Sequence, residues 1–174
     1  IHEVKVYKDA PDEVATIMEE ADVIYCLDFN QIQRLEGLSE CIERNTHAKT
    51  VLIDHHLEPP HIFDVELSFP KCSSTSYLVY LLICELDGTD GITKGMAENL
   101  YVGIMTDTGN FSFSNLTPGL FYCVAELLKK GIDIPYINRM VYNSYSAERL
   151  KLLGHSLDKM RTVEAGGEQI AWIT

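Results

Sequence analysis

Acidic and imidazole side chains follow two apolar runs of the sequence, at the points where each run ends. Asp28 ends the stretch "VIYCLD" at 23–28, and Asp54, His55 and His56 come directly after Val51–Ile53. Prolines at 59 and 60 then prevent regular structure from continuing. In open parallel sheets, ligands bind outside the carboxyl ends of the strands, so we expect these groups to lie close together in space.

A third acid, Asp107, lies in the stretch "TDTGNF", where a predicted helix gives way to a loop. Gly109 indicates a turn that needs freedom in φ or a close approach of the backbone. Such a loop can return the acid to the mouth of the same site.

Carboxylates and neutral imidazoles together suit Mn²⁺ and related divalent metals better than soft thiolate ligands do. Two such metals can activate a bridging water and stabilise both oxygens of a phosphoryl displacement. The residue types therefore predict metal-dependent chemistry on a phosphate ester.

Each acid also has a plainer interpretation. Asp28 could cap a following helix, Asp107 could be an ordinary turn acid, and Asp54 could form an Asx turn before the prolines. The adjacent His55 and His56 are harder to explain, because two neighbouring imidazoles at a strand end have no common packing role. The pair therefore favours the metal-site interpretation.

The elements that must position these residues alternate between strands and helices. The pattern predicts strands at 22–29 and 49–56, a short strand or extended segment at 61–69, and a turn into a strand at 164–174. It predicts helices at 10–21, 31–45 with an interruption at Gly37, 73–88, 92–105, 117–131 and 146–160. We expect an α/β domain with a mostly parallel, doubly wound sheet and helices on both faces.

Composition limits the class of protein. The chain has 174 residues, 46% of them hydrophobic, and we expect neither a membrane span nor a signal peptide. Five cysteines without paired metal spacing indicate reduced thiols and a cytoplasmic protein. Because the sequence opens on Ile1 with "IHEVKVY", we expect a fragment of a longer protein.

The formal net charge of −12 opposes long-range capture of a nucleic-acid backbone, which needs clustered lysines and arginines. It does not exclude phosphate chemistry, since bound divalent cations reverse the local electrostatics of a site. If the substrate is a nucleotide, we expect it to be small.

Several stretches carry a resemblance to a known family. "IDHH" at 53–56 resembles the signature of the DHH phosphoesterases, and "YCLDFNQIQRL" at 25–35 is similar to that family's second motif. "CSSTSYLVYLL" at 72–82 resembles the helix that follows the DHH segment. "YVGIMTDTGNFSFSNLTP" at 101–118 resembles the fourth motif, in the form found in the nano-RNase/pAp phosphatase branch.

The resemblance implies two Mn²⁺ ions, with Mg²⁺ as an alternative. Asp28 would bridge the two metals, and His55 and Asp107 would bind one of them. His56 would act catalytically beside the bridging water or the scissile phosphate, and Asp54 would orient the histidines. Weaker candidates for contacts with phosphate or with the ligands are Arg34, Ser74 and Thr75.

The family's first motif, a histidine and an Asp-x-Asp after a strand, is absent from the sequence, as is the C-terminal substrate domain. We therefore expect residues 1–144 to form a catalytic domain truncated at its N-terminus, and 145–161 to form a linker helix. Residues 162–174 would begin a second domain or form a terminal strand. The chain would then hold about half of the metal site, and the fragment alone could be inactive.

The implied function is a phosphoesterase that degrades very short oligoribonucleotides, dephosphorylates 3′,5′-bisphosphate nucleotides such as pAp, or both. A cyclic-dinucleotide phosphodiesterase and a single-strand exonuclease use the same core and stay open as alternatives. A catalytically inactive nucleotide-binding or regulatory domain is the alternative from another class. We expect short RNA or pAp as partners, no membrane, and leave a homodimer open.

Overall fold

The computed structural model describes residues 4–35, 37–59, 61–113 and 115–173. The chain divides into two compact units, Ile1–Ile132 and Asp133–Thr174. The division into 1–144, 145–161 and 162–174 stays a prediction.

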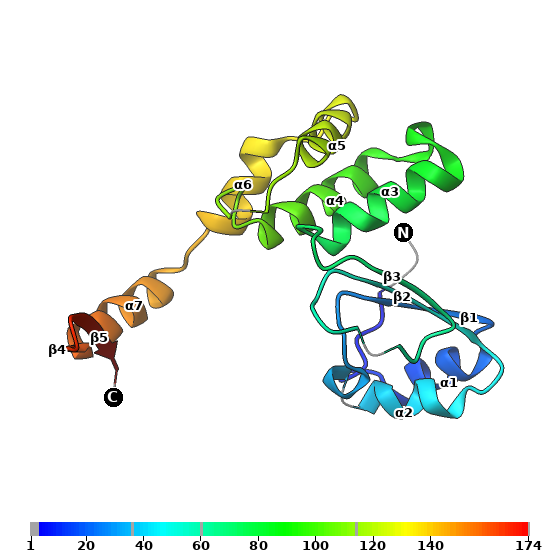
Figure 1. The fold of residues 1–174 in the computed structure, drawn as a ribbon, viewed down its shortest axis with the longest axis horizontal. Coiled ribbons are helices and arrows are strands. Elements are labelled where there is room, and N and C mark those ends of the chain that lie inside the picture. The colour runs from blue at the N-terminus through cyan, green and yellow to red at the C-terminus, as the bar shows by residue number, and fades with distance from the viewer. Residues whose placement is uncertain (1–3, 36, 60, 114, 174) are drawn as a thin grey trace. The chain divides into compact units, whose positions relative to one another are not determined.

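A three-stranded parallel sheet forms the centre of the first unit (Figure 1). Its order is β1 (Val23–Leu27), β2 (Lys49–Asp54) and β3 (Val65–Ser68), and both neighbouring pairs are parallel. The predicted parallel pairing of the strands that end near Asp28 and Ile53 is confirmed, because Leu27 is aligned with Ile53. β3 is shorter than the segment predicted at 61–69. The unit is an α/β fold, as predicted.

Two helices, α1 (Pro11–Glu20) and α2 (Gly37–Arg44), contribute to the layer on one face of the sheet. Helix α1 begins with a proline and carries two acids in its first turn, where the helix dipole favours negative charge. A short 3₁₀ helix, η1 (Ile32–Leu35), precedes α2, so the helix predicted over 31–45 is only partly α-helical. The core cluster on this face consists of Ile24, Cys26, Phe29, Ile42, Ala48 and Leu52.

The side chain of Asn45 ties the end of α1 to the start of β2. Its amide nitrogen donates to the carbonyl of Met18 at 2.8 Å and of Ala21 at 2.9 Å. Its side-chain oxygen accepts from the backbone N–H of His47 at 3.1 Å and of Ala48 at 2.8 Å. A single buried amide thus satisfies backbone groups of two connecting segments.

A helical layer lies on the other side of the sheet and contains α3 (Thr75–Asp87), η2 (Thr89–Gly91), α4 (Lys94–Asp107) and α5 (Pro118–Lys129). The three α-helices begin at side-chain caps from Ser74, Thr93 and Thr117. Helices α3 and α4 pack closely at Gly103, where an added Cβ would lie 1.9 Å from Ser76 Oγ. The fully buried apolar side chains of this layer include Tyr101, Ile104, Met105, Leu120 and Leu127.

Strand β1 is an edge strand of the sheet in the described chain, since its neighbour there is β2. Its alternate residues Val23, Tyr25 and Leu27 are 46%, 59% and 46% exposed, whereas Ile24 and Cys26 face the core. The strand therefore presents an apolar row to its surroundings on the face opposite to α1 and α2.

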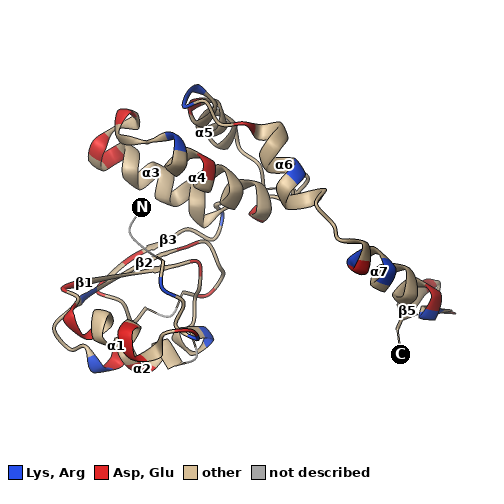
Figure 2. Cartoon of the chain, turned by 180° about the vertical axis from the view of Figure 1, so that it is seen from behind, with Lys and Arg blue, Asp and Glu red and all other residues tan. Residues whose placement is uncertain are grey.

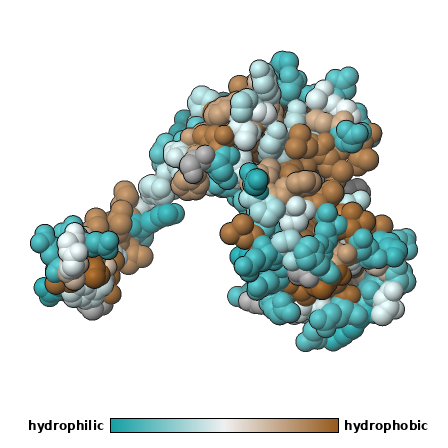
Figure 3. Space-filling view, viewed as in Figure 1, coloured by the Kyte–Doolittle hydropathy of each residue, from teal (hydrophilic) through white to brown (hydrophobic). Residues whose placement is uncertain are grey.

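The second unit contains α6 (Ile134–Tyr142), α7 (Ala147–Lys159) and an antiparallel hairpin of β4 (Arg161–Ala165) and β5 (Glu168–Trp172). Gly166 and Gly167, both with positive φ, make the hairpin turn. Helix α7 has no buried residue and shows an apolar surface (Figure 3), to which Leu150, Leu153 and Leu157 contribute. Across the described residues, no helix is both long and apolar enough to cross a membrane.

Candidate metal centre

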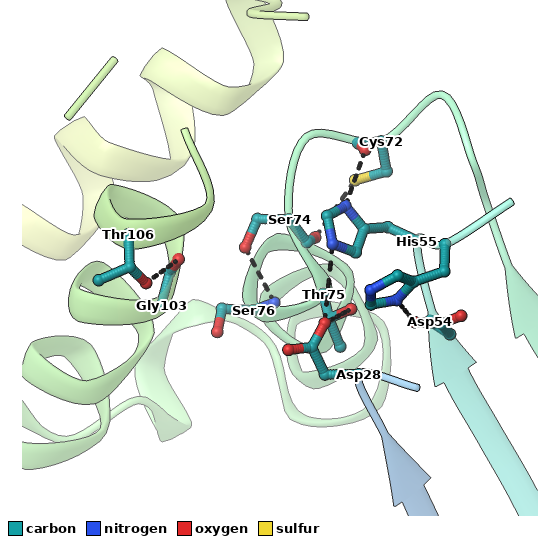
Figure 4. A network of polar contacts seen from close by, with 10 residues as sticks. Asp28, Asp54, His55, Cys72, Ser74, Thr75, Ser76, Gly103 and Thr106 are labelled. Atoms are coloured by element: carbon teal, nitrogen blue, oxygen red, sulfur yellow. Dashed lines mark hydrogen bonds and ion pairs between the residues drawn. The ribbon is translucent and has the colours of Figure 1, made fainter. Parts of the chain in front are cut away.

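Three side chains converge at the carboxyl ends of β1 and β2. Asp28, His55 and His56 each offer a ligand atom, and these three atoms all lie within 4.8 Å of one another. Asp28 follows the last residue of β1, and the two histidines follow the last residue of β2 (Figure 4). The structure thus brings together residues 27 positions apart because parallel strands end at the same edge of the sheet.

Asp28 adopts a backbone conformation that is unusual for a residue with a side chain. Its φ is +66°, in the left-handed region, which aspartate tolerates better than most residues do. Its N–H still donates to the Ile53 carbonyl at 3.1 Å, so the residue remains anchored to β2. The carboxylate accepts a hydrogen bond of 2.9 Å from the Thr75 hydroxyl at the start of α3.

The His55 ring is held by a backbone carbonyl. Its Nδ1 lies 3.3 Å from the Cys72 carbonyl oxygen, which can only accept, so Nδ1 carries the proton in this contact. Its Nε2 lies 3.6 Å from Asp28 Oδ1. In this tautomer the free lone pair of Nε2 points to the side of the ring where a shared cation would sit.

The His56 ring is held by a buried acid. Its Nδ1 lies 2.7 Å from Asp54 Oδ1, and Asp54 is fully buried at the end of β2. This contact leaves Nε2 of His56 available to a metal or a substrate. The two imidazoles meet edge to face, with ring centroids 5.0 Å apart and an angle of 70° between their planes.

A cavity of about 540 Å³ opens in front of the two histidines. Asn30, Leu57 and Glu58 complete its lining. The Asn30 amide donates to the Leu57 carbonyl at 2.7 Å and so holds the segment that follows the histidines. The cavity gives a ligand of small-molecule size access to both imidazoles.

Asp107, the third predicted metal ligand, ends α4 and is half-buried. It is not in the group formed by Asp28, His55 and His56. It does lie within electrostatic reach of the segment that holds His55. Burial is the main cause that raises the pKa of the Cys72 thiol, and the negative charge of Asp107 raises that pKa further.

The turn after Asp107 is strongly restrained. The Thr108 hydroxyl donates to the Ile104 carbonyl at 2.7 Å and accepts from the Phe111 N–H at 3.1 Å. Gly109, Asn110 and Phe111 all have positive φ, a run that persists only where surrounding contacts determine it. The predicted glycine-dependent turn is therefore present, and it fixes the end of α4.

The weaker candidates occupy different places. Thr75 contacts Asp28 directly, and Ser74 is fully buried as the cap of α3, where its hydroxyl accepts from the Ser76 N–H at 3.1 Å. Arg34 lies exposed in η1. The sequence analysis did not predict the contact between the Cys72 carbonyl and His55, because every residue has a backbone carbonyl and its partner cannot be read from the residue type.

The donor set fits a divalent cation. One carboxylate and two imidazole nitrogens lie close enough to share an ion, and each imidazole has an outer acceptor that fixes its tautomer. By donor chemistry alone, this set suits Mn²⁺, Fe²⁺ or Zn²⁺ better than Ca²⁺, which prefers oxygen ligands.

Comparison with known proteins identifies the family. Residues 2–104 match the model described as DHH family, N-terminal domain. The chain belongs to the DHH family. The segment matched contains Asp28 and the Asp54–His55–His56 triplet, so the three converging side chains lie in the part of the chain that carries the family resemblance.

One solved structure and two curated proteins illustrate what the chain is similar to. The crystal structure of an exopolyphosphatase-related protein from Bacteroides fragilis is 39% identical, with a TM-score of 0.86 over 91% of this chain and 46% of that one. The bifunctional oligoribonuclease and PAP phosphatase NrnA of Thermus thermophilus is 38% identical over 47% of this chain and 25% of its own length. An A-adding tRNA nucleotidyltransferase of Aquifex aeolicus is 30% identical over 79% of this chain and 16% of its own length. This DHH-family chain therefore spans less than half of the length of these proteins.

Proposed function

We propose that the protein containing this chain is a divalent-metal-dependent phosphoesterase that acts on very short oligoribonucleotides and on 3′,5′-bisphosphate nucleotides. The observation that carries the proposal is the convergence of Asp28, His55 and His56 at the carboxyl edge of the sheet. The similarity to a protein named as an oligoribonuclease and PAP phosphatase supports the substrate class.

We assign each residue a role that its contacts support. Asp28 and His55 hold the cation, with the Thr75 hydroxyl and the Cys72 carbonyl restraining their side chains. His56 presents Nε2 to the water or the phosphate, while Asp54 keeps the proton on Nδ1. When bound, the cation lowers the pKa of a coordinated water and stabilises charge on the phosphate oxygens. We propose Mn²⁺ as the cation, with two ions in the whole protein.

Asp107 and a further segment of the longer protein would complete the ligand set. The described cluster supplies three donors, which is few for two metals. The negative charge of Asp107 acts on the Cys72 thiol, in the segment that holds His55, and we propose Asp107 as a ligand of a second ion. In this proposal residues 1–144 are part of the catalytic domain, 145–161 a linker helix, and 162–174 the beginning of a substrate domain.

The charge distribution favours a small substrate. The net charge is −12, and basic residues are dispersed over the elements rather than gathered along one path (Figure 2). A protein that tracks a long strand needs a basic groove along the nucleic-acid backbone. A substrate of a few nucleotides instead needs charge neutralisation chiefly at the reacting phosphate, where a metal supplies it.

A substrate panel on the full-length protein tests the proposal. Turnover of RNAs of about two to five nucleotides and of pAp is compared with that of long RNA, at one salt concentration and with and without Mn²⁺. We expect Mn²⁺-dependent hydrolysis that is faster on the short RNAs. Faster turnover of the long strand would contradict the substrate class, and nucleotide binding without hydrolysis would identify an inactive binding domain.

A further inference from the structure

Two buried polar atoms lie on adjacent strands behind the metal centre. Asp54 Oδ2 and Ser68 Oγ are both buried, and neither has a hydrogen-bond partner within the part of the chain that the structure describes. Asp54 is the last residue of β2 and Ser68 the last of β3, and the two are aligned in the parallel pairing. The coincidence of two such atoms at one place in the sheet calls for a physical reason.

Their alignment places both side chains on the same face of the sheet. Aligned residues of neighbouring parallel strands point the same way, and the strands lie about 4.8 Å apart. The register at this point is fixed by the backbone, because the Phe69 N–H donates to the Asp54 carbonyl at 3.0 Å. Ser68 Oγ and Asp54 Oδ2 therefore belong to side chains that stand next to each other on neighbouring strands.

The two groups are chemically complementary. An ionised carboxylate only accepts hydrogen bonds, whereas a serine hydroxyl has a proton that rotates to meet an acceptor. Leaving a buried acceptor without a donor is unfavourable, and more so when the acceptor is charged. A hydrogen bond between Ser68 and Asp54 would remove this cost for both atoms.

We propose that Ser68 is a positioning residue that donates a hydrogen bond to Asp54 Oδ2 and thereby holds Asp54 against His56. The chain of contacts runs from Ser68 to Asp54 and from Asp54 Oδ1 to Nδ1 of His56, at 2.7 Å in the last step. With both oxygens held, the Asp54 carboxylate cannot rotate away from the ring. His56 then keeps its proton on Nδ1 and presents Nε2 to the cavity.

The catalytic consequence rests on the proposed phosphoesterase function, but the structural consequence does not. If His56 acts on the reacting phosphate, loss of the hydrogen bond from Ser68 to Asp54 lowers kcat. The tautomer of the His56 ring, by contrast, is a property of the metal-free protein and needs no substrate. The two consequences can therefore be measured separately.

Three variants of the full-length protein test the role of Ser68. Ser68→Ala removes the hydroxyl, Ser68→Cys keeps its approximate size with a weak donor, and Ser68→Thr keeps the donor and suits a strand. Far-UV circular dichroism and thermal midpoints first establish that each variant is folded. The ¹⁵N chemical shifts of the His56 ring are then recorded without metal, and kcat and KM are measured on a short RNA with Mn²⁺.

We expect the wild-type protein and Ser68→Thr to hold His56 as the Nδ1–H tautomer, and Ser68→Ala and Ser68→Cys to give a mixture of tautomers. We expect kcat to fall about 10- to 100-fold in the latter two with little change in KM, as when a partner of a ligating or catalytic histidine is lost. A wild-type tautomer in Ser68→Ala, or equal losses in Ser68→Ala and Ser68→Thr, would overturn the proposal. An inactive wild-type protein would instead overturn the proposed function, while the tautomer measurement would still decide the role of Ser68.

Discussion

The Thr75 hydroxyl donates a hydrogen bond of 2.9 Å to Asp28 Oδ1, and so joins the first turn of α3 to the carboxyl end of β1. The two residues are 47 positions apart in the sequence. Thr75 is 4% exposed, so its position is set by the packing of α3 rather than by solvent. The candidate metal centre is therefore supported by the helical layer as well as by the sheet.

Replacing Thr75 by Val should weaken metal binding without unfolding the protein. Valine has the same shape but no donor, so the Asp28 carboxylate loses the contact that restrains it. We expect the affinity of the full-length protein for Mn²⁺ to fall about 10- to 100-fold, the range for partners of metal ligands. Calorimetric titration measures it, with Thr75→Ser as the matched control that keeps the hydroxyl. Equal affinities for Mn²⁺ in Thr75→Val and wild type would show that the hydrogen bond from Thr75 to Asp28 does not contribute to metal binding.

His55 and His56 should differ when each is replaced by Ala. We expect His55→Ala to lose Mn²⁺ affinity, because Nε2 of His55 lies 3.6 Å from Asp28 Oδ1, and in the proposed site these two atoms would share the cation. We expect His56→Ala to keep most of the metal while turnover falls about 100- to 10,000-fold, the usual contribution of a proton-transfer group. Calorimetry and single-turnover kinetics on the full-length protein separate the two effects.

Other outcomes would change the assigned roles. The ligand atoms of both rings lie within 4.8 Å of the Asp28 ligand atom and of each other, so the geometry also allows His56 to be a ligand. If His56→Ala loses metal as fully as His55→Ala does, both histidines are ligands. If both variants keep metal and activity, the triplet is a structural turn.

The ionised Asp64 carboxylate should stabilise the fold, and this stabilisation should be lost at acid pH. The Lys49 ammonium at 2.7 Å, together with hydrogen bonds from the Thr50 N–H and hydroxyl, lowers the pKa of the Asp64 carboxyl to about 2. An unfolded aspartate has a pKa of about 3.9, so the folded state favours the ionised form. The resulting stabilisation is fully present above about pH 4 and is lost as pH falls towards 2.

Thermal melts of wild type and Asp64→Asn between pH 2 and 6 check this expectation. The difference in midpoint between the two proteins should be largest above pH 4 and should shrink as the solution is acidified. Asp158→Asn, at an exposed position of α7, is the matched control and should show no such trend. A difference that stays constant over the whole range would contradict the role of the Lys49–Asp64 pair.

Asn45→Ala should destabilise the first unit more than a surface substitution does. The change leaves the Met18 and Ala21 carbonyls and the His47 and Ala48 N–H groups without their side-chain partner. Because a buried backbone group without a partner costs about 1–3 kcal/mol, we expect a loss of at least that size. Urea unfolding measures the loss, and Asn45→Asp should not recover it, because a carboxylate oxygen would then face the Met18 and Ala21 carbonyls.

The sheet and most helices were predictable because their sequence patterns are local. The apolar runs before Asp28 and Asp54 gave two strands and their parallel order, and the capped helices α3 and α5 were predicted close to their observed bounds. Helix α6 was not predicted, although Asp133 caps it and Pro135 lies in its first turn. Strand β4 was missed as well, although the Gly166–Gly167 turn is typical of a hairpin.

The candidate site was only partly predictable, for a different reason. Residue types identified Asp28, His55 and His56, and strand topology explains why they meet. The Cys72 carbonyl and the place of Ser68 beside Asp54 depend on how distant backbone segments are aligned, which no local pattern contains. The position of Asp107 relative to the other three residues depends on the packing of α4. The role of Asp107 as a metal ligand stays a prediction.

The position of β1 at the edge of the sheet has a practical consequence for work with the isolated chain. Within the described residues β1 has an open backbone edge, and its half-exposed Val23, Tyr25 and Leu27 form an apolar row on one face, so we expect the 174-residue chain to associate at high concentration. A lysine in place of Tyr25, which is not one of the candidate ligands, would oppose such association by charge repulsion. The solubility of the isolated chain would then depend on β1, a strand that contains none of the candidate ligands.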